Sequence, residues 1–429
     1  MERHDPARRR AVLVICDGHR DDFLRPETCP AIHALAGRSR RFLAHRAIFP
    51  SATRASSASI ATGCWPARHG LHGNTMGLPD GGDGYRVHDV GDPAFVAALR
   101  AAKGRTLAVP TLAERLADHG GAVIASNVSP GAAYFQDPDH FGHVVHRAGS
   151  YGPGGRPLGP DEAPAVAHDG TGDEALAAWF ADEVLLHRRP RLGVLWLANP
   201  DLAMHADELG SPTHLAGIAA ADRCVARVEA AVEALRAEGE DVLLLVGSDH
   251  GQETVIGRVA VADRLVEAGL KESADSTDVV VAPQGGSGFV YVAPRAAGRI
   301  AAIAAFLDAQ PYIAEVFRGS ALLPLGQAPE GGLALAFAMA RDEAPNPFGV
   351  PGRIVLCVSD DKPGKAEGAG SHGGLGRFER HPFLIGNGGG FAPGTVETGT
   401  TRLVDIAPTI LRFLGLPRGG MDGLALPQS

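Results

Sequence analysis

Short, uninterrupted apolar runs alternate with longer helical segments along the first half of the chain, and this alternation constrains the fold more than any other feature. The runs are AVLVIC (11–16), GAVIAS (121–126), LGVLWLA (192–198) and DVLLLVG (241–247). Runs that are apolar at nearly every position are typical of strands buried on both faces of a parallel sheet. Helical periodicity covers the intervening residues 111–120, 173–189 and 214–240. The sequence therefore predicts an α/β fold with a mostly parallel central sheet flanked by helices.

The pattern loosens after the fourth apolar run. Stretches rich in Gly and Pro, at residues 282–288 and 342–352, surround one helix-like segment and several short strands. The chain then returns to the main sheet through PFLIGN (382–387) and ends in a helix. We therefore expect a smaller cap domain inserted into a catalytic α/β core, with the core formed by residues 1–254 and 366–429 and the cap by residues 255–365.

Composition narrows the classes of function. The net charge of -9 and the pI near 6.0 lack the basic excess that binding to a nucleic-acid polymer requires. No run approaches the roughly 18 apolar residues of a membrane span, and AVLVIC is shorter than the apolar core of a signal peptide. We expect a cytoplasmic enzyme that acts on a small molecule and has no membrane partner. The sequence does not indicate its oligomeric state.

Acidic and histidine side chains follow the predicted strands at their carboxyl ends, where open parallel sheets bind their ligands. The first strand is followed by Asp17, the third by Asn199, Asp201 and His205, and the fourth by Ser248, Asp249 and His250. A distant glycine-rich turn, GSHGG, adds His372. Several separate segments therefore supply Asp and His to one edge of the sheet.

Each of these residues also has a structural explanation. Asp17 fits the N-cap of the next helix as well as it fits a functional role, and His205 is one of 18 histidines. The conjunction of D-x-x-x-H, an adjacent D-H, a strand-terminal Asp and G-S-H-G at one sheet edge favours a metal site. Mixed Asp and His ligands suit zinc, with manganese or iron as alternatives. The number of ligands indicates two divalent ions.

Several segments, in this order along the chain, carry a resemblance to a known family. They are VICDG, FPSATRASSASIATG with CWPARHGLHGN, NPDLAMH, GSDHGQ, GSHGG, and VDIAPTIL with GMDGLALP. The chain resembles the alkaline phosphatase superfamily, in particular the nucleotide pyrophosphatase/phosphodiesterase branch and the related phosphonoacetate hydrolases. The resemblance implies an alkaline phosphatase-like core and a dinuclear metal-dependent hydrolase of phosphodiesters or related phosphonates.

The resemblance also implies roles for individual residues. Asp201, His205 and His372 would hold one zinc ion, and Asp17, Asp249 and His250 the other. Thr53 would be the nucleophile, would bridge toward the second ion and would form a phosphothreonine intermediate. Asn74 would donate a hydrogen bond to a phosphoryl oxygen.

The chemistry of Thr53 agrees with that implied role. A bound zinc ion can depress the pKa of an oxygen ligand by many units. A helix that begins at Thr53 directs unpaired N–H groups at an anion. Ser51, Ser56, Ser57 and Ser59 are rival hydroxyls, but serines inside a helix usually serve packing or hydrogen bonds to the backbone.

At several positions this chain has other residues than the family it resembles, so the resemblance does not determine the substrate. Arg54 stands beside the nucleophile, where the family has no cation, and is a second candidate for substrate binding. A strong cation there would suit a phosphomonoesterase, whereas Asn74 suits a singly charged diester. The segment 126–151 lacks the lysines that bind the carboxylate of phosphonoacetate but offers aromatic, His and Arg side chains for a substrate. A C–P bond hydrolase and a pseudoenzyme that only binds a metal or ligand remain the alternatives.

Overall fold

The structure is a computed structural model that describes residues 6–359 and 364–428. Among these residues, ten strands form one large sheet in the order β21-β2-β20-β11-β1-β10-β6-β7-β8-β9. They are β1 (Arg9–Cys16), β2 (Arg40–Phe42), β6 (Ala122–Ser126), β7 (His143–Val145), β8 (Tyr151–Gly152), β9 (Arg156–Pro157), β10 (Leu192–Leu197), β11 (Asp241–Gly247), β20 (Leu384–Asn387) and β21 (Thr395–Glu397). The four central strands, β11, β1, β10 and β6, run parallel, as the apolar runs predict.

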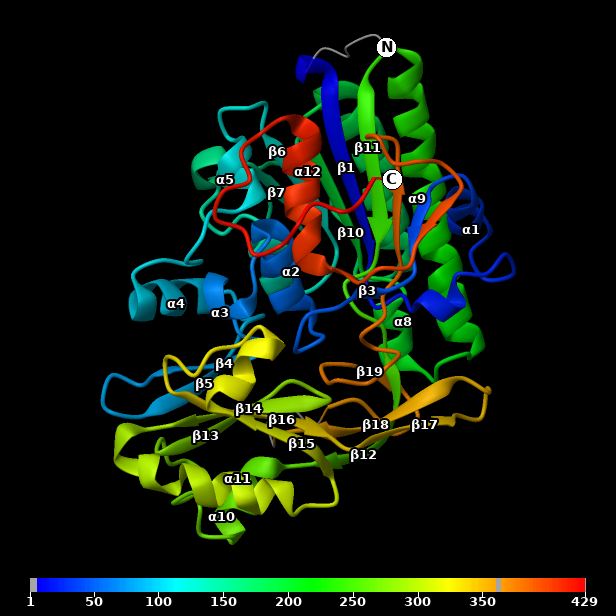
Figure 1. Cartoon of the computed structure of the whole chain (residues 1–429). Helices are drawn as coiled ribbons and strands as arrows, with labels where there is room; N and C mark the ends of the chain where they lie inside the picture. Colours follow the sequence, from blue (N-terminus) through cyan, green and yellow to red (C-terminus); the bar gives the residue numbers. More distant parts are fainter. Residues whose placement is uncertain (1–5, 360–363, 429) are drawn as a thin grey trace.

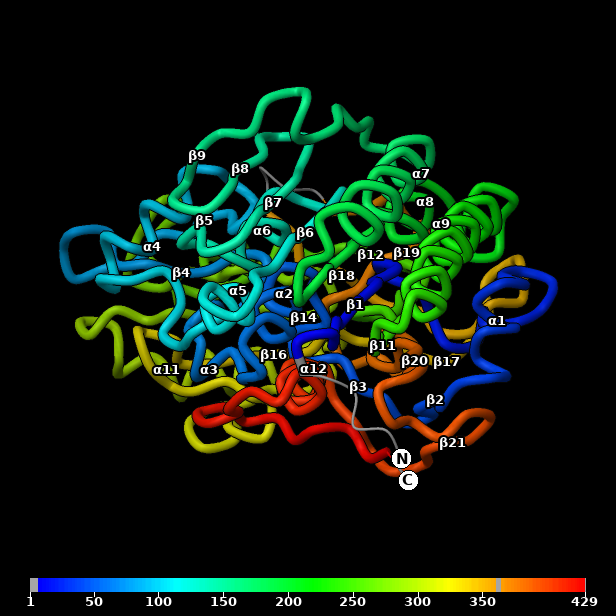
Figure 2. Tube along the Cα trace, turned by 90° about the horizontal axis from the view of Figure 1, so that it is seen from above, coloured from blue at the N-terminus to red at the C-terminus, as the bar shows by residue number. Residues whose placement is uncertain are grey.

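Alternate residues of the central strands pack against opposite helical layers. On β1, Val12 and Val14 belong to one apolar core, while Leu13 and Ile15 belong to another. The first core is covered by α1 (Pro30–Gly37), α7 (Gly170–Trp179), the π-helix η4 (Phe180–Arg188) and α9 (Pro212–Ala237). The second is covered by α2 (Thr53–Thr62), α5 (Leu112–Leu116), α6 (Pro130–Tyr134) and α12 (Ile406–Leu414). Figure 2 shows α7 and α9 on one side of β1 and α12 on the other. The predicted fold class is confirmed.

A second, smaller body lies beneath the large sheet in Figure 1. Its antiparallel sheet has the order β13-β14-β16-β15 and carries α10 (Val261–Glu267) and α11 (Ile300–Asp308). These strands are β13 (Val279–Pro283), β14 (Ser287–Val292), β15 (Ile313–Arg318) and β16 (Leu333–Met339). They all fall within the segment expected to form the cap.

A further sheet joins this body to the core. Its order is β17-β18-β12-β19, formed by β12 (Glu253–Val259), β17 (Arg341–Pro345), β18 (Pro351–Cys357) and β19 (Gly370–Ser371). Because β12 begins before residue 255 and pairs with β19 beyond residue 365, the sheet crosses both expected cap boundaries. The hairpin of β4 (Thr75–Pro79) and β5 (Tyr85–Asp89) also contacts β13 from the early part of the chain. The division into core and cap stays a prediction.

The remaining described elements are short or connect the sheets. The helices are η1 (Pro6–Arg8), η2 (Asp21–Phe23), α3 (Pro66–His69), α4 (Phe95–Lys103), η3 (Pro153–Gly155), α8 (Asp201–Ala206), η5 (Pro294–Arg299), η6 (Gly319–Leu325) and η7 (Leu403–Asp405). The strands β3 (His45–Arg46) and β22 (Thr401–Arg402) form a parallel pair. No helix in the described ranges is long and apolar enough to cross a membrane.

Candidate active site

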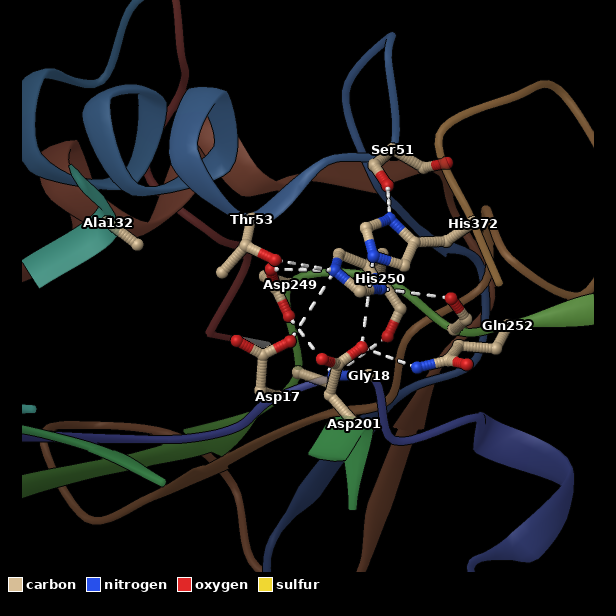
Figure 3. A network of polar contacts seen from close by, with 12 residues as sticks. Asp17, Gly18, Ser51, Thr53, Ala132, Asp201, Asp249, His250, Gln252 and His372 are labelled. Atoms are coloured by element: carbon tan, nitrogen blue, oxygen red, sulfur yellow. Dashed lines mark hydrogen bonds and ion pairs between the residues drawn. The ribbon is translucent and has the colours of Figure 1, made fainter. Parts of the chain in front are cut away.

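The strand-end side chains meet at one edge of the sheet. Asp17 follows β1, Asp201 and His205 lie one turn apart on α8 after β10, and Asp249 with His250 follows β11. Because β1 pairs in parallel with both β10 and β11, the three carboxyl ends lie side by side. The turn after β19 brings His372 to the same place (Figure 3).

These side chains form two groups with the spacing of metal ligands. The ligand atoms of Asp17, Asp249 and His250 lie within 4.8 Å of one another. The same spacing joins Asp201, His250 and His372. His205 is outside the second group, although its Nε2 lies 3.4 Å from Oδ2 of Asp201. The structure therefore brings all six predicted ligands together, with His250 near both groups.

Three carboxyl groups lie close together at this centre, and within the described ranges their ion-pair partners are histidines rather than lysine or arginine. Burial, followed by the charges of Asp249 and Asp201, raises the pKa of Asp17 well above its ordinary value. Burial also raises the pKa of Asp249. Oδ1 of Asp17 and Oδ2 of Asp249 are buried without a hydrogen-bond partner. Both oxygens lie near Nε2 of His250, at 3.4 Å and 3.3 Å. Buried carboxylates without a hydrogen-bond partner are costly unless they are protonated or bound to a cation, so this set of Asp and His ligands fits divalent metal ions.

The three imidazole rings are oriented by backbone carbonyls. Nδ1 of His205 lies 2.9 Å from the oxygen of Gly370. Nδ1 of His372 lies 2.6 Å from the oxygen of Ser51, and Nδ1 of His250 makes the same type of contact with the next residue at 2.9 Å. With Nδ1 donating, Nε2 keeps its lone pair, as in metal-binding histidines. Burial lowers the pKa of His205 and of His372, which favours the neutral ring that a metal requires.

Thr53 is the first residue of α2 and lies over this centre. Its Oγ1 is 3.1 Å from Nε2 of His250 (Figure 3). The rival hydroxyls are directed elsewhere: Ser57 donates to the oxygen of Ala132 at 2.5 Å, and Ser59 contacts a buried histidine. Thr53 lines a cavity over this centre, which we call the catalytic cavity, whereas Ser51, Ser56, Ser57 and Ser59 do not line it.

This catalytic cavity, of about 690 Å³, opens over the two ligand groups. Its wall combines residues of the core with Val281, Pro283 and Gln284 from the expected cap. The segment 126–151 contributes Val128, Ser129, Pro130 and Arg147. Several aromatic side chains of that segment pack against each other instead, since the ring of Tyr134 contacts the rings of His146 and Tyr151.

Asn74 and Arg54 both line the catalytic cavity. The backbone N–H of Arg54 donates to Oδ1 of Asn74 at 3.1 Å, which fixes the amide so that its NH₂ group remains a donor. The Arg54 guanidinium donates to the backbone oxygen of Asn74 at 2.7 Å, and it pairs with Asp89. Its charge is therefore partly neutralised. The substrate-binding roles of both residues stay predictions.

Three supporting contacts were not predicted from the sequence. Nε1 of Trp196 donates to Oδ2 of Asp17 at 2.9 Å, and Gln252 donates to Oδ1 of Asp201. The Glu379 carboxylate accepts a 2.7 Å hydrogen bond from the Ser51 hydroxyl. The position of Gln252, directly after the D-H-G turn, and the Trp in an otherwise aliphatic strand were the available signals. Nothing local distinguishes Glu379.

The chain matches the family described as type I phosphodiesterase / nucleotide pyrophosphatase over residues 11–314. A comparison with curated proteins returned no significant match.

Similar solved structures share the fold at low sequence identity. Murine ectonucleotide pyrophosphatase / phosphodiesterase 5 has 17% identity and a TM-score of 0.64, with 98% of this chain and 97% of that chain covered. An inactive form of the murine protein, in complex with AMP, has 17% identity, a TM-score of 0.65 and the same coverage. Phosphonoacetate hydrolase from Sinorhizobium meliloti 1021, in complex with phosphonoformate, has 17% identity, a TM-score of 0.67 and 95% coverage of both chains. The predicted resemblance is confirmed, and the chain belongs to the type I phosphodiesterase / nucleotide pyrophosphatase family.

Proposed function

We propose that this protein hydrolyses small phosphodiesters or related phosphonates with Thr53 as the nucleophile and two divalent ions, preferably zinc, as cofactors. Family membership supports the coarser statement that it is a phosphodiesterase/pyrophosphatase-type hydrolase. One observation carries the finer proposal: the Thr53 hydroxyl, at a helix N-terminus, lies 3.1 Å from His250, which belongs to both ligand groups. A cytoplasmic location remains part of the proposal.

The chain's own groups suit an in-line displacement at phosphorus. Bound divalent ions would depress the pKa of the nucleophile and neutralise charge on the leaving oxygen. They would be held by Asp201, His205 and His372, and by Asp17, Asp249 and His250. The Thr53 oxygen attacks phosphorus, the alcohol leaves, and water hydrolyses the phosphothreonine. The Asn74 NH₂ group, oriented by the Arg54 backbone, donates to a non-bridging oxygen.

The proposal is tested by substitution at Thr53. Thr53→Ala removes the attacking oxygen but leaves every metal ligand other than Thr53 in place, so kcat/KM should fall about a thousandfold or more while metal content is retained. Thr53→Ser should keep measurable turnover. Rates on an aryl phosphodiester and metal analysis of the same samples give the comparison, and acid-quenched wild-type protein should contain phosphorylated Thr53.

Ser56→Ala is the matched control. Ser56 lies on the same helix, is fully buried, and its hydroxyl has no hydrogen-bond partner among the described residues. Its removal should leave kcat/KM within a few-fold of wild type. Near wild-type turnover by Thr53→Ala with both metals bound would exclude the covalent route.

The preferred ester depends on the charge around the catalytic cavity. Because Arg54 is paired with Asp89, we expect diesters to be hydrolysed faster than monoesters. Arg147 and Lys365 also line the cavity and supply cations for a second anionic group of a phosphonate substrate. This preference is tested by comparing kcat/KM for aryl phosphodiesters, phosphomonoesters, nucleotide pyrophosphates and phosphonates. A monoester preferred tenfold or more would refute the predicted preference for diesters.

A further inference from the structure

A second cavity lies behind the segment that carries the nucleophile. Its volume is about 560 Å³, and none of the predicted metal ligands lines it. Phe49 forms part of its wall, while Thr53, four residues later, lines the catalytic cavity. We call it the arginine cavity, because its wall includes three arginines: Arg46, which lies on β3, Arg402, which lies on β22, and Arg380, which lies in a turn. Trp65 and the end of η6 also contribute to the wall.

The wall of the arginine cavity carries three arginines against two carboxylates, Asp405 and Asp422, an excess of one positive charge. None of these arginines forms an ion pair with a carboxylate within the described part of the chain, although many other arginines do. Within the described ranges, the one hydrogen bond of the Arg46 guanidinium joins Nη1 to Nδ1 of His381 at 2.9 Å. Nε of Arg380 is buried without a hydrogen-bond partner. Arg46 and Arg380 are only partly buried, so their guanidinium groups can reach an anion in the cavity and form charge-assisted hydrogen bonds with it.

The acidic groups nearby are engaged elsewhere. Asp405 accepts hydrogen bonds from the backbone N–H groups of Arg402, at 2.8 Å, and Leu424, at 2.9 Å. Asp422 pairs with Arg68 at 2.7 Å and accepts the backbone N–H of Trp65 at 3.0 Å. These two carboxylates also line the cavity. Asp405 interacts electrostatically with Arg402, so the excess positive charge lies at Arg46 and Arg380.

Glu379, next to Arg380 in sequence, is likewise engaged. Its oxygens bind Ser51, Gly374 and Gly376. Burial, then the charge of Arg46, lowers the pKa of Arg380, and the charge of Glu379 opposes this shift.

Apolar side chains form the rest of the arginine cavity. They are Ile48, Phe49, Trp65, Leu323, Pro324, Leu325, Val404 and Leu424. Leu323 is 59% exposed and Leu424 is 78% exposed, which is unusual for large aliphatic side chains beside a cavity. A ligand with an anionic head and an apolar body would satisfy both parts of the wall.

We propose that the arginine cavity binds a small aromatic or aliphatic organic anion, with its charged head at Arg46 and Arg380 and its apolar body against Trp65. This site is separate from the hydrolytic centre and does not depend on the proposed reaction. Guanidinium groups bind carboxylate, sulfonate and phosphate heads through the same paired N–H donors.

Benzenesulfonate, which contains no phosphorus and no hydrolysable ester, is the probe. Calorimetric titration of the metal-loaded protein should show one saturable site whose affinity falls with salt concentration. Arg46→Gln and Arg380→Gln should each weaken binding about tenfold. Methanesulfonate, which lacks the ring, should bind more weakly than benzenesulfonate.

Arg377→Gln is the matched control. Arg377 is exposed in the same turn as Arg380, pairs with Glu343 at 3.4 Å and does not line the arginine cavity. This substitution should leave the affinity unchanged. Asn74→Ala alters the catalytic cavity alone and should also leave it unchanged.

Chemical modification of the wild-type protein gives a test that needs no variant to fold. Benzenesulfonate should protect Arg46 from phenylglyoxal, as followed by peptide mass spectrometry, and should not protect Arg377. The proposal is wrong if benzenesulfonate does not bind, if both Arg→Gln variants bind it normally, or if Asn74→Ala abolishes binding. Equal protection of Arg46 and Arg377 would also overturn it.

Discussion

Glu379→Gln tests whether the Glu379 carboxylate holds the segments that carry Ser51 and His372 in place. Glu379 is fully buried. One carboxylate oxygen accepts the backbone N–H of Gly376 at 2.8 Å, and the other accepts the Ser51 hydroxyl at 2.7 Å and the N–H of Gly374 at 2.8 Å. Ser51 in turn holds the His372 ring through its backbone oxygen at 2.6 Å. One carboxylate therefore fixes segments on both sides of the centre.

The substitution keeps the shape of the side chain but turns one acceptor into a donor. The new side-chain amide can be placed in two ways, and the one that keeps its oxygen at Ser51 and Gly374 preserves more hydrogen bonds. Its NH₂ group then faces the N–H of Gly376 and leaves that buried donor unsatisfied, which costs about 1–3 kcal/mol. The two remaining hydrogen bonds lose the negative charge of their acceptor and weaken further. Removing a negative charge beside the buried carboxyl of Glu253 offsets part of this loss. We expect a net loss of about 2 kcal/mol in the free energy of unfolding.

Urea denaturation of the metal-loaded protein, analysed with a common slope, measures this loss. Glu343→Gln is the control, because Glu343 is an exposed acid whose partner, Arg377, lies 3.4 Å away, and exposed pairs contribute little. Metal affinity should fall in Glu379→Gln and stay constant in the control. A change in unfolding free energy below about 0.5 kcal/mol, with metal affinity retained, would refute the idea that Glu379 supports the centre.

Three further predictions concern other buried groups. Burial, then a neighbouring carboxylate, raises the pKa of Glu253 to about 8 from 4.5. The protonated Glu253 carboxyl therefore stabilises the folded protein fully below pH 4.5, and this stabilisation is lost as the pH rises through 8, by up to about 1.4 kcal/mol per pH unit. In urea denaturation across this range, the free energy of unfolding of Glu253→Gln should depend less on pH than that of the wild-type protein. Trp196→Phe removes the 2.9 Å hydrogen bond to Asp17 and should weaken metal binding about 10–100-fold in a chelator competition, whereas unchanged affinity would contradict a supporting role. Gly373→Ala would place a Cβ 1.7 Å from the oxygen of Gln284 at a φ of +101°, so thermal unfolding should show a loss above about 3 kcal/mol.

The sheet could be predicted because its central strands are buried on both faces. Continuous apolar runs identify such strands directly, and β1, β6, β10 and β11 match them closely. Helix lengths were less predictable. The helix expected at 111–120 ends at Leu116, where a turn leads into Gly120 and Gly121, both with positive φ. The segment 173–189 continues from α7 into a π-helix, a change in hydrogen bonding that apolar periodicity does not report.

The part of the candidate site that follows the parallel strands could be predicted from the sequence. Parallel neighbours must bring Asp17, Asp201 and Asp249 to one edge, so their proximity followed from the strand assignment. The position of His250 near both groups depends on side-chain rotamers, which the sequence does not encode locally. The contact of Glu379 with Ser51 depends on tertiary packing across 328 residues.

The strand order of the large sheet also has a consequence for synthesis of the chain. β20 lies between β11 and β2 and hydrogen-bonds to both, although β2 is made early and β20 close to the C-terminus. Until Leu384–Asn387 emerge from the ribosome, one edge of the apolar strand β11 has no partner, and β2 cannot join the sheet. Unpaired apolar edges recruit other chains. A growing or truncated chain that ends before Leu384 should therefore depend on chaperones to remain soluble, whereas the finished chain closes this edge itself.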